Sequence, residues 1–253
     1  MLILSDNCTA ITIISTYAQP IATMLGALIV VVFAPLIGAW AYFRRKEYET
    51  VRQRYLDDGI LPIIKQVEDS LNIFEYNWAH SIHLLKIYRD LSYNTPPELY
   101  KSGFVAINKP VSFEASRHYL LMDIIGDKVY FNVHQLLTAF LHDSNSLFID
   151  DLCSAIRVSL EGGKEDTEIA APEVIFNTYV KELEKKSEEH KPYYIFLGNL
   201  QILASLLAKE QYSFKKLGEF RNKPEVQKSI SVLKEMYKEQ LAKYSDLPVG
   251  KSS

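Results

Sequence analysis

The sequence predicts an all-α protein, with one transmembrane helix near the N-terminus followed by a cytoplasmic multi-helix bundle. Three observations predict this fold class. Residues Ile21 to Phe43 are almost continuously apolar, and a helix needs about 20 such residues to cross the hydrocarbon core. Behind this segment, apolar residues recur at spacings of three and four, which is the period of a helix. No stretch shows the alternation of apolar and polar residues that is typical of a half-buried strand.

Length and composition fit one medium domain plus an anchor. The chain has 253 residues, of which 48 % are hydrophobic and 23 % charged, as in globular proteins. Its 28 basic and 31 acidic residues give a net charge of −3, so the chain lacks the basic field that suits nucleic acid and we expect no nucleic-acid partner. The two cysteines, Cys8 and Cys153, lie on opposite sides of the apolar segment. We therefore expect neither a disulfide nor a cysteine zinc site.

The apolar segment has the features of a membrane span. Asn7 to Phe43 contains no Asp, Glu, Lys, Arg or His, and Trp40 and Tyr42 stand near its end, where amphipathic rings prefer to lie. Pro35 is compatible with a helix in lipid. A cleaved signal peptide is the main alternative, but the only charged side chain before the span is Asp6, and a signal peptide needs a basic start. We assign residues 1–16 to a short non-cytoplasmic segment and residues 17–43 to the transmembrane helix.

Basic residues on one side of the span predict its orientation. They are Arg44, Arg45, Lys46, Arg52 and Arg54. No Lys or Arg precedes the span, and short basic flanks stay in the cytoplasm. The N-terminus is thus expected outside and the large domain inside, with a bacterial inner membrane as the expected location. The lipid bilayer is one predicted partner. Residues 44–59 should form a helical stalk that ends at Gly59.

The cytoplasmic domain, residues 60–246, is predicted to be a series of helices. Pro62 suits the first turn of a helix that reaches Arg89 and has a clear apolar stripe. The stripe contains Ile64, Val67, Leu71, Phe74, Trp78, Ile82, Leu85 and Tyr88. The breaker Asn94-Thr95-Pro96-Pro97 follows. A helix capped by Ser112 should then end at Gly126.

Further helices follow to the end of the domain. Residues 129–160 should be helical with a break near 143–145, and residues 161–166 should form a loop. Pro172, Pro192 and Pro224 should each begin a helix, and the last of these helices should have one buried face. That face comprises Val226, Ile230, Leu233, Tyr237 and Leu241. Residues 247–253 are expected to be a frayed tail. Residues 193–208 are apolar enough to raise the alternative of a second span, but they are shorter than a span requires, so we expect a buried core helix.

One local motif suggests catalysis. His142-Asp143 resembles the His-Asp pair with which helical phosphohydrolases hold a divalent metal that activates water. His118 or His134 would be the first ligand in that hypothesis. The last ligand would be Asp150, Asp151 or Asp166. Spacing does not single out any of them, and Asp143 is equally suited to a helix end. His80 and His83 share a helix surface, as a metal pair would, but a third ligand cannot be named.

These observations favour a membrane-anchored interaction, sensor or effector module without a catalytic site, cofactor or metal. A protein partner or self-association is expected, because small residues in the span permit close helix packing. These residues are Gly26, Ala27, Ala34, Gly38 and Ala39. Two alternatives remain, a membrane-tethered metal-dependent phosphohydrolase and a small pore-forming effector.

Overall fold

The computed structural model describes residues 20, 22–90, 115–161 and 172–245. Nearly all of these residues are helical and none of them forms a strand, which confirms the all-α prediction. The chain forms two compact units, Met1–Thr50 and Val51–Ser253. The predicted cap Ser112, the breaker at 94–97, most of the loop at 161–166 and the tail at 247–253 lie outside the described residues.

The first unit is helical throughout its described part. A π-helical segment, η1 (Ile29–Phe33), leads into α2 (Ala34–Arg52). Pro35 lies inside this continuous helix, two residues after η1 ends, and the wider turns of a π-helical segment accommodate a residue that has no N–H. The helix therefore continues past Pro35, as the sequence predicts.

In the second unit the helix does not end at Gly59, so this prediction was wrong. Residues 53–60 form a second π-helical segment, η2 (Gln53–Ile60), which passes directly into α3 (Leu61–Asp90). The N–H of Leu61 bonds the carbonyl of Leu56, five residues back, and this wider turn accommodates Pro62, which has no N–H of its own. Gly59 is buried, and a Cβ there would lie 3.2 Å from the carbonyl oxygen of Arg54. This glycine provides close packing and does not cap the helix.

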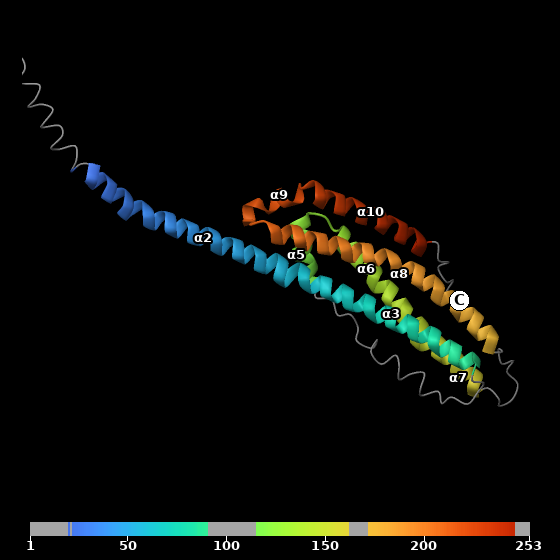
Figure 1. Cartoon of the computed structure of the whole chain (residues 1–253). Coiled ribbons are helices and arrows are strands. Elements are labelled where there is room, and N and C mark those ends of the chain that lie inside the picture. The colour runs from blue at the N-terminus through green and yellow to red at the C-terminus, as the bar shows by residue number, and fades with distance from the viewer. Residues whose placement is uncertain (1–19, 21, 91–114, 162–171, 246–253) are drawn as a thin grey trace, which may run out of the picture. The chain divides into compact units, whose positions relative to one another are not determined.

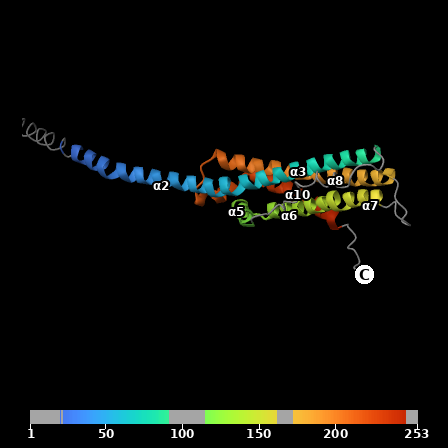
Figure 2. The same cartoon turned by 90° about the horizontal axis from the view of Figure 1, so that it is seen from below.

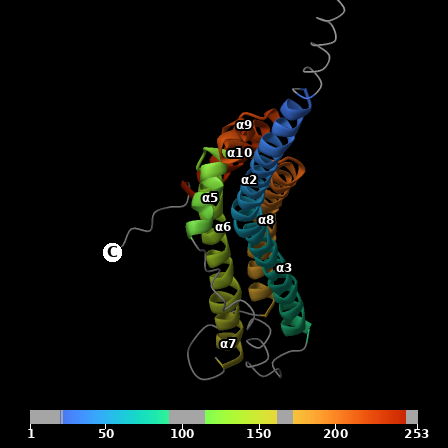
Figure 3. The same cartoon turned by 90° about the vertical axis from the view of Figure 1, so that its left-hand side faces the viewer.

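Four long helices run lengthwise through the second unit: α3, α6 (Val129–Asn145), α8 (Pro172–Lys209) and α10 (Pro224–Ser245) (Figure 1). Helix α3 packs along α8, while α10 packs on α6 and α8 (Figure 2). The short helices α5 (Ala115–Ile125) and α9 (Leu217–Arg221) lie at one end of the unit, and α7 (Cys153–Glu161) lies at the other (Figure 3). Two short segments, η4 (Ser146–Leu152) and η5 (Phe214–Lys216), complete the described elements.

The predicted apolar stripe of α3 faces the core. Its residues Val67, Leu71, Phe74, Leu85 and Tyr88 are buried, and the other three are partly buried. On α10 the prediction holds for most of the face but fails at its end. Leu241 is 45 % exposed, whereas Gln240 is only 2 % exposed. A polar residue therefore occupies the position where the apolar pattern led us to expect a leucine.

Helix α8 is continuous, so the prediction that Pro192 begins a new helix was wrong. Pro192 lies inside α8, where a proline costs about 3 kcal/mol. Core residues stand on both sides of it, with Leu183 and His190 before it and Tyr193 and Phe196 after it, all buried. Packing along the whole helix offsets the cost of the proline. Residues 193–208 thus lie in a helix of the core.

The boundaries of α5 and α6 follow the sequence signals closely. Gly126 ends α5 with a φ of +71°, a left-handed conformation that glycine adopts without strain. Helix α6 changes at Ser146 to the π-helical η4 before α7 begins. Residues 143–145 belong to α6 and the chain stays helical beyond them, so the predicted break near 143–145 was wrong.

Candidate functional site

The first unit contains an apolar helix surface that the unit itself does not cover. Among the described residues, one helix is long and apolar enough to cross a membrane. Its most apolar window of 18 residues has a mean hydropathy of 2.3, and none of that window is buried. Met24 is 74 % exposed and Val31 is 71 % exposed. In water, such side chains would forgo about 1.5–3 kcal/mol each of hydrophobic stabilisation.

The residues of the predicted membrane flank are all exposed. They are Trp40, Tyr42, Arg44, Arg45, Lys46, Arg52 and Arg54. The guanidinium of Arg44 lies 4.5 Å from the centre of the Trp40 ring, and Arg45 forms an ion pair with Glu49. In the second unit, the guanidinium of Arg54 lies 5.3 Å from the ring of Tyr55. The pair of Trp40 and Arg44, a cation next to an amphipathic ring, suits the boundary between lipid and water, whereas Tyr55 is buried in the bundle.

His142 and Asp143 lie in the last turn of α6, and both are exposed. His134, one of the two proposed first ligands, is buried, while Asp150 and Asp151 are exposed. His118 belongs to α5, but its side chain and residue 166 lie outside the described part. Among the residues that the structure describes, no three His, Cys, Asp or Glu side chains are grouped as a metal site requires. The described residues thus give the phosphohydrolase hypothesis no ligand set.

Asp143 nevertheless lines a pocket of about 420 Å³ where α6, α8 and α10 meet. The other lining residues are Lys185, Lys186, Glu188 and Glu189 of α8, and Gln240 and Lys243 of α10. The Nζ atom of Lys186 lies 3.2 Å from Glu189 and 5.6 Å from the centre of the Phe140 ring. The α8 part of this pocket belongs to a run at 181–190 that is rich in lysines and glutamates.

Gln240 is the buried polar residue of this pocket. Its amide Nε2 is buried and has no hydrogen-bond partner in the described part of the chain. Its burial was not predicted from the sequence, although a signal was present. Gln240 stands four residues after the buried Met236 and seven after the buried Leu233, so it interrupts an apolar stripe at helical spacing. A polar side chain that takes a core position in this way needs a structural or functional reason.

A second buried polar group lies among aromatic rings of the core. The imidazole of His190 is 4 % exposed and stacks on Phe74, with ring centres 4.2 Å apart. It also lies near Phe140 and meets Tyr194 edge-on, with ring centres 5.0 Å apart. Burial lowers the pKa of His190 to about 4, although Glu75 opposes this shift, so the imidazole is neutral at pH 7. Its Nε2 has no hydrogen-bond partner among the described residues.

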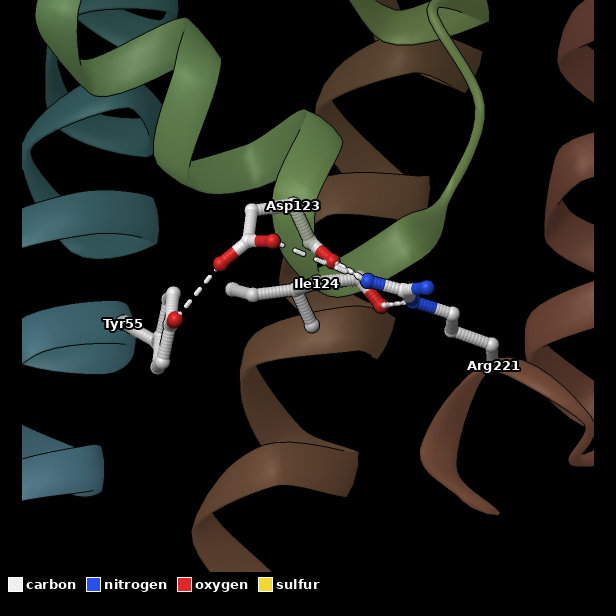
Figure 4. Close-up of polar contacts among 4 residues, drawn as sticks. All are labelled: Tyr55, Asp123, Ile124 and Arg221. Atoms are coloured by element: carbon white, nitrogen blue, oxygen red, sulfur yellow. Dashed lines mark hydrogen bonds and ion pairs between the residues drawn. The ribbon is translucent and has the colours of Figure 1, made fainter. Parts of the chain in front are cut away.

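A polar network fastens α5 to the rest of the second unit. Figure 4 shows Asp123 of α5 between Tyr55 of η2 and Arg221 of α9. The Tyr55 hydroxyl donates to Asp123 Oδ2 at 2.6 Å, and burial together with this bond raises the pKa of Tyr55. Arg221 donates from Nε to the carbonyl oxygen of Ile124 at 3.1 Å and from its second amino group to the carbonyl of Asp123. These contacts satisfy carbonyls at the end of α5 that have no partner within the helix.

Comparison with known protein families, curated proteins and solved structures found no match for this chain. The features that bear on function are therefore the exposed apolar helix and its basic flank.

Proposed function

We propose that this protein is a single-pass membrane protein that holds a helical interaction module at the cytoplasmic face of a membrane. The exposed apolar helix of the first unit supports this proposal most directly. Among the described residues, none of its most apolar window is buried, and a lipid bilayer is the environment that would cover a helix of this length and composition.

The charge pattern supports the orientation of the span. All basic residues near the helix follow it, and none precedes it. In the positive-inside rule, this asymmetry keeps the following domain in the cytoplasm and sends the N-terminus outside. The pair formed by Trp40 and Arg44 would then mark the cytoplasmic boundary, with the ring in the interface and the cation toward water. A bacterial inner membrane is the proposed location.

Self-association through the span is the proposed mode of interaction. The small residues of this helix are exposed, and the space beside Gly26 and Gly38 is open, with no atom within 4 Å of a Cβ built at either position. Small residues permit two helices in lipid to approach closely. The bundle adds apolar side chains on the exposed surfaces of α3 and α8 for a protein partner. They include Ile73, Tyr76, Ile195 and Ile202.

Membrane fractionation tests the anchor. The double variant Leu28→Lys/Val31→Lys places two charges at the centre of the span, each costing about 2.5–3.5 kcal/mol there. We expect the variant to leave the membrane fraction or to be degraded. Val174→Lys/Leu241→Lys makes the same exchanges at bundle positions that are 55 % and 45 % exposed, so this matched control should stay with the membrane. Equal behaviour of the two variants, or a wild-type chain that is soluble without detergent, would contradict the anchor.

Reporter fusions after Ser253 test the orientation. A reporter that is active only in the cytoplasm should be active, and one that is active only outside should be silent. Replacing Arg44, Arg45 and Lys46 by Gln should weaken this preference, because these charges supply the topological signal. An external C-terminus in the wild-type chain would show that the proposed orientation is wrong.

A further inference from the structure

The pocket between α6, α8 and α10 contains a hydrogen-bond donor without an acceptor. Gln240 is 2 % exposed, yet it lines the pocket, and its amide Nε2 has no partner among the described residues. Proteins rarely leave a buried donor unpaired, because the group has lost its bonds to water and gained nothing in exchange. A ligand oxygen in the pocket would supply the missing acceptor.

The charges of the pocket favour an anion. Two of its carboxylates already have cationic partners. Glu189 pairs with Lys186 at 3.2 Å, and Glu188 pairs with Lys191 at 2.6 Å. Within the described residues the other three charges, Lys185, Lys243 and Asp143, form no ion pair. The charges that are not in ion pairs are therefore two ammonium groups and one carboxylate. This leaves an excess of positive charge beside an N–H donor that has no acceptor.

We infer that this pocket binds a small anion with carboxylate or phosphate oxygens. The Gln240 amide donates from Nε2 to one ligand oxygen, while Lys185 and Lys243 balance the negative charge. Asp143, which also lines the pocket, limits how much negative charge the pocket accepts. The volume of about 420 Å³ lies in the range of small-molecule sites. The inference assigns a ligand to the bundle and does not depend on membrane anchorage.

Calorimetric titration of the full-length chain in detergent micelles tests this site. The probes are inorganic phosphate and citrate, each at constant ionic strength with chloride as the reference anion. We expect saturable binding of at least one probe. Binding of phosphate alone would identify a phosphate ligand, and binding of citrate alone would identify a carboxylate ligand.

Four variants show whether binding occurs in this pocket. Gln240→Leu removes the donor and should weaken binding about tenfold or more, as expected for a lost hydrogen bond to a charged group. Lys243→Gln should weaken binding and Asp143→Asn should strengthen it, because the ligand is an anion. Lys238→Gln removes an exposed lysine of α10 that does not line the pocket, and it should leave the affinity unchanged.

Several results would overturn the inference. It fails if neither anion binds, if Gln240→Leu binds like the wild type, or if Lys243→Gln and Lys238→Gln have equal effects. Stronger binding by Lys243→Gln together with weaker binding by Asp143→Asn would identify a cation site instead. If Gln240→Leu does not fold, Lys243→Gln and Asp143→Asn still decide the question, because both change exposed side chains. Fractionation of the same samples reports on the anchor separately, so the two proposals can fail independently.

Discussion

The buried His190 makes the stability of the bundle depend on pH. Its imidazole stacks on Phe74 in the core, and burial lowers its pKa to about 4 in the folded protein. In the unfolded chain a histidine has a pKa of about 6.5. As the pH falls below about 6.5, His190 of the unfolded chain binds a proton, whereas His190 of the folded protein does not bind one until about pH 4. Stability is therefore lost across this window when the pH is lowered.

The size of this effect follows from the two pKa values. Between pH 8 and pH 5, the difference in proton uptake lowers the free energy of unfolding by about 2 kcal/mol. His190→Phe keeps an aromatic ring against Phe74 and removes the titrating group. Because the titrating group is gone, the stability of the variant should change less with pH than that of the wild type. The variant should also lose the cost of the buried Nε2, which has no partner among the described residues.

Urea unfolding of the full-length chain in detergent measures this difference. The protein has two tryptophans, and Trp40→Phe leaves Trp78 as the reporter. Trp78 reports on the bundle because its Nε1 donates to the carbonyl oxygen of Leu183 at 2.9 Å. The free energies of unfolding of both proteins are compared at pH 8 and pH 5, so that other titrating groups cancel. If the two pH dependences agree to within about 0.5 kcal/mol, His190 does not titrate as we argue.

Three further substitutions test other parts of the bundle by the same unfolding assay. Asn77 is fully buried, and neither side-chain amide atom has a hydrogen-bond partner among the residues that the structure describes, so Asn77→Leu should raise stability by about 1–3 kcal/mol; a loss would reveal a partner for the amide. Gly126→Ala forces an alanine to a φ of +71° and should cost about 1–2 kcal/mol, whereas a neutral result would place Gly126 in an ordinary conformation. Tyr55→Phe removes the bond to Asp123 and should cost about 0.5–1.5 kcal/mol, unless the tyrosine hydroxyl is satisfied by water in the folded protein.

Helical periodicity predicted the fold class and most of the core. The stripe of α3 and the start of α10 at Pro224 agree with the structure, because apolar residues at a spacing of three and four must share one buried face. Gly126 also ends α5 as expected. These features depend on neighbouring residues in the chain, which a sequence displays directly.

The sequence analysis failed where distant residues override a local signal. Gly59 and Pro192 are breakers by local rules, yet helices run through both because the flanking residues pack into the core. The candidate ligand pocket was missed for a similar reason. Gln240, Asp143 and Lys185 come from three helices, and only the packing of α10 on α6 and α8 brings them together. The spacing within α10 marks Gln240 alone and does not show that Asp143 and Lys185 lie beside it.

The bonds from Arg221 to the end of α5 have a consequence for the order in which the chain acquires its structure. The carbonyl of Ile124 receives its donor from a residue 97 positions further along. While the ribosome is still making the intervening segment, that carbonyl can bond only to water. Helix α5 therefore reaches its final form only after α9 has been synthesised and has docked. A protein truncated before Arg221 would lose this interaction between two segments that are far apart in the chain.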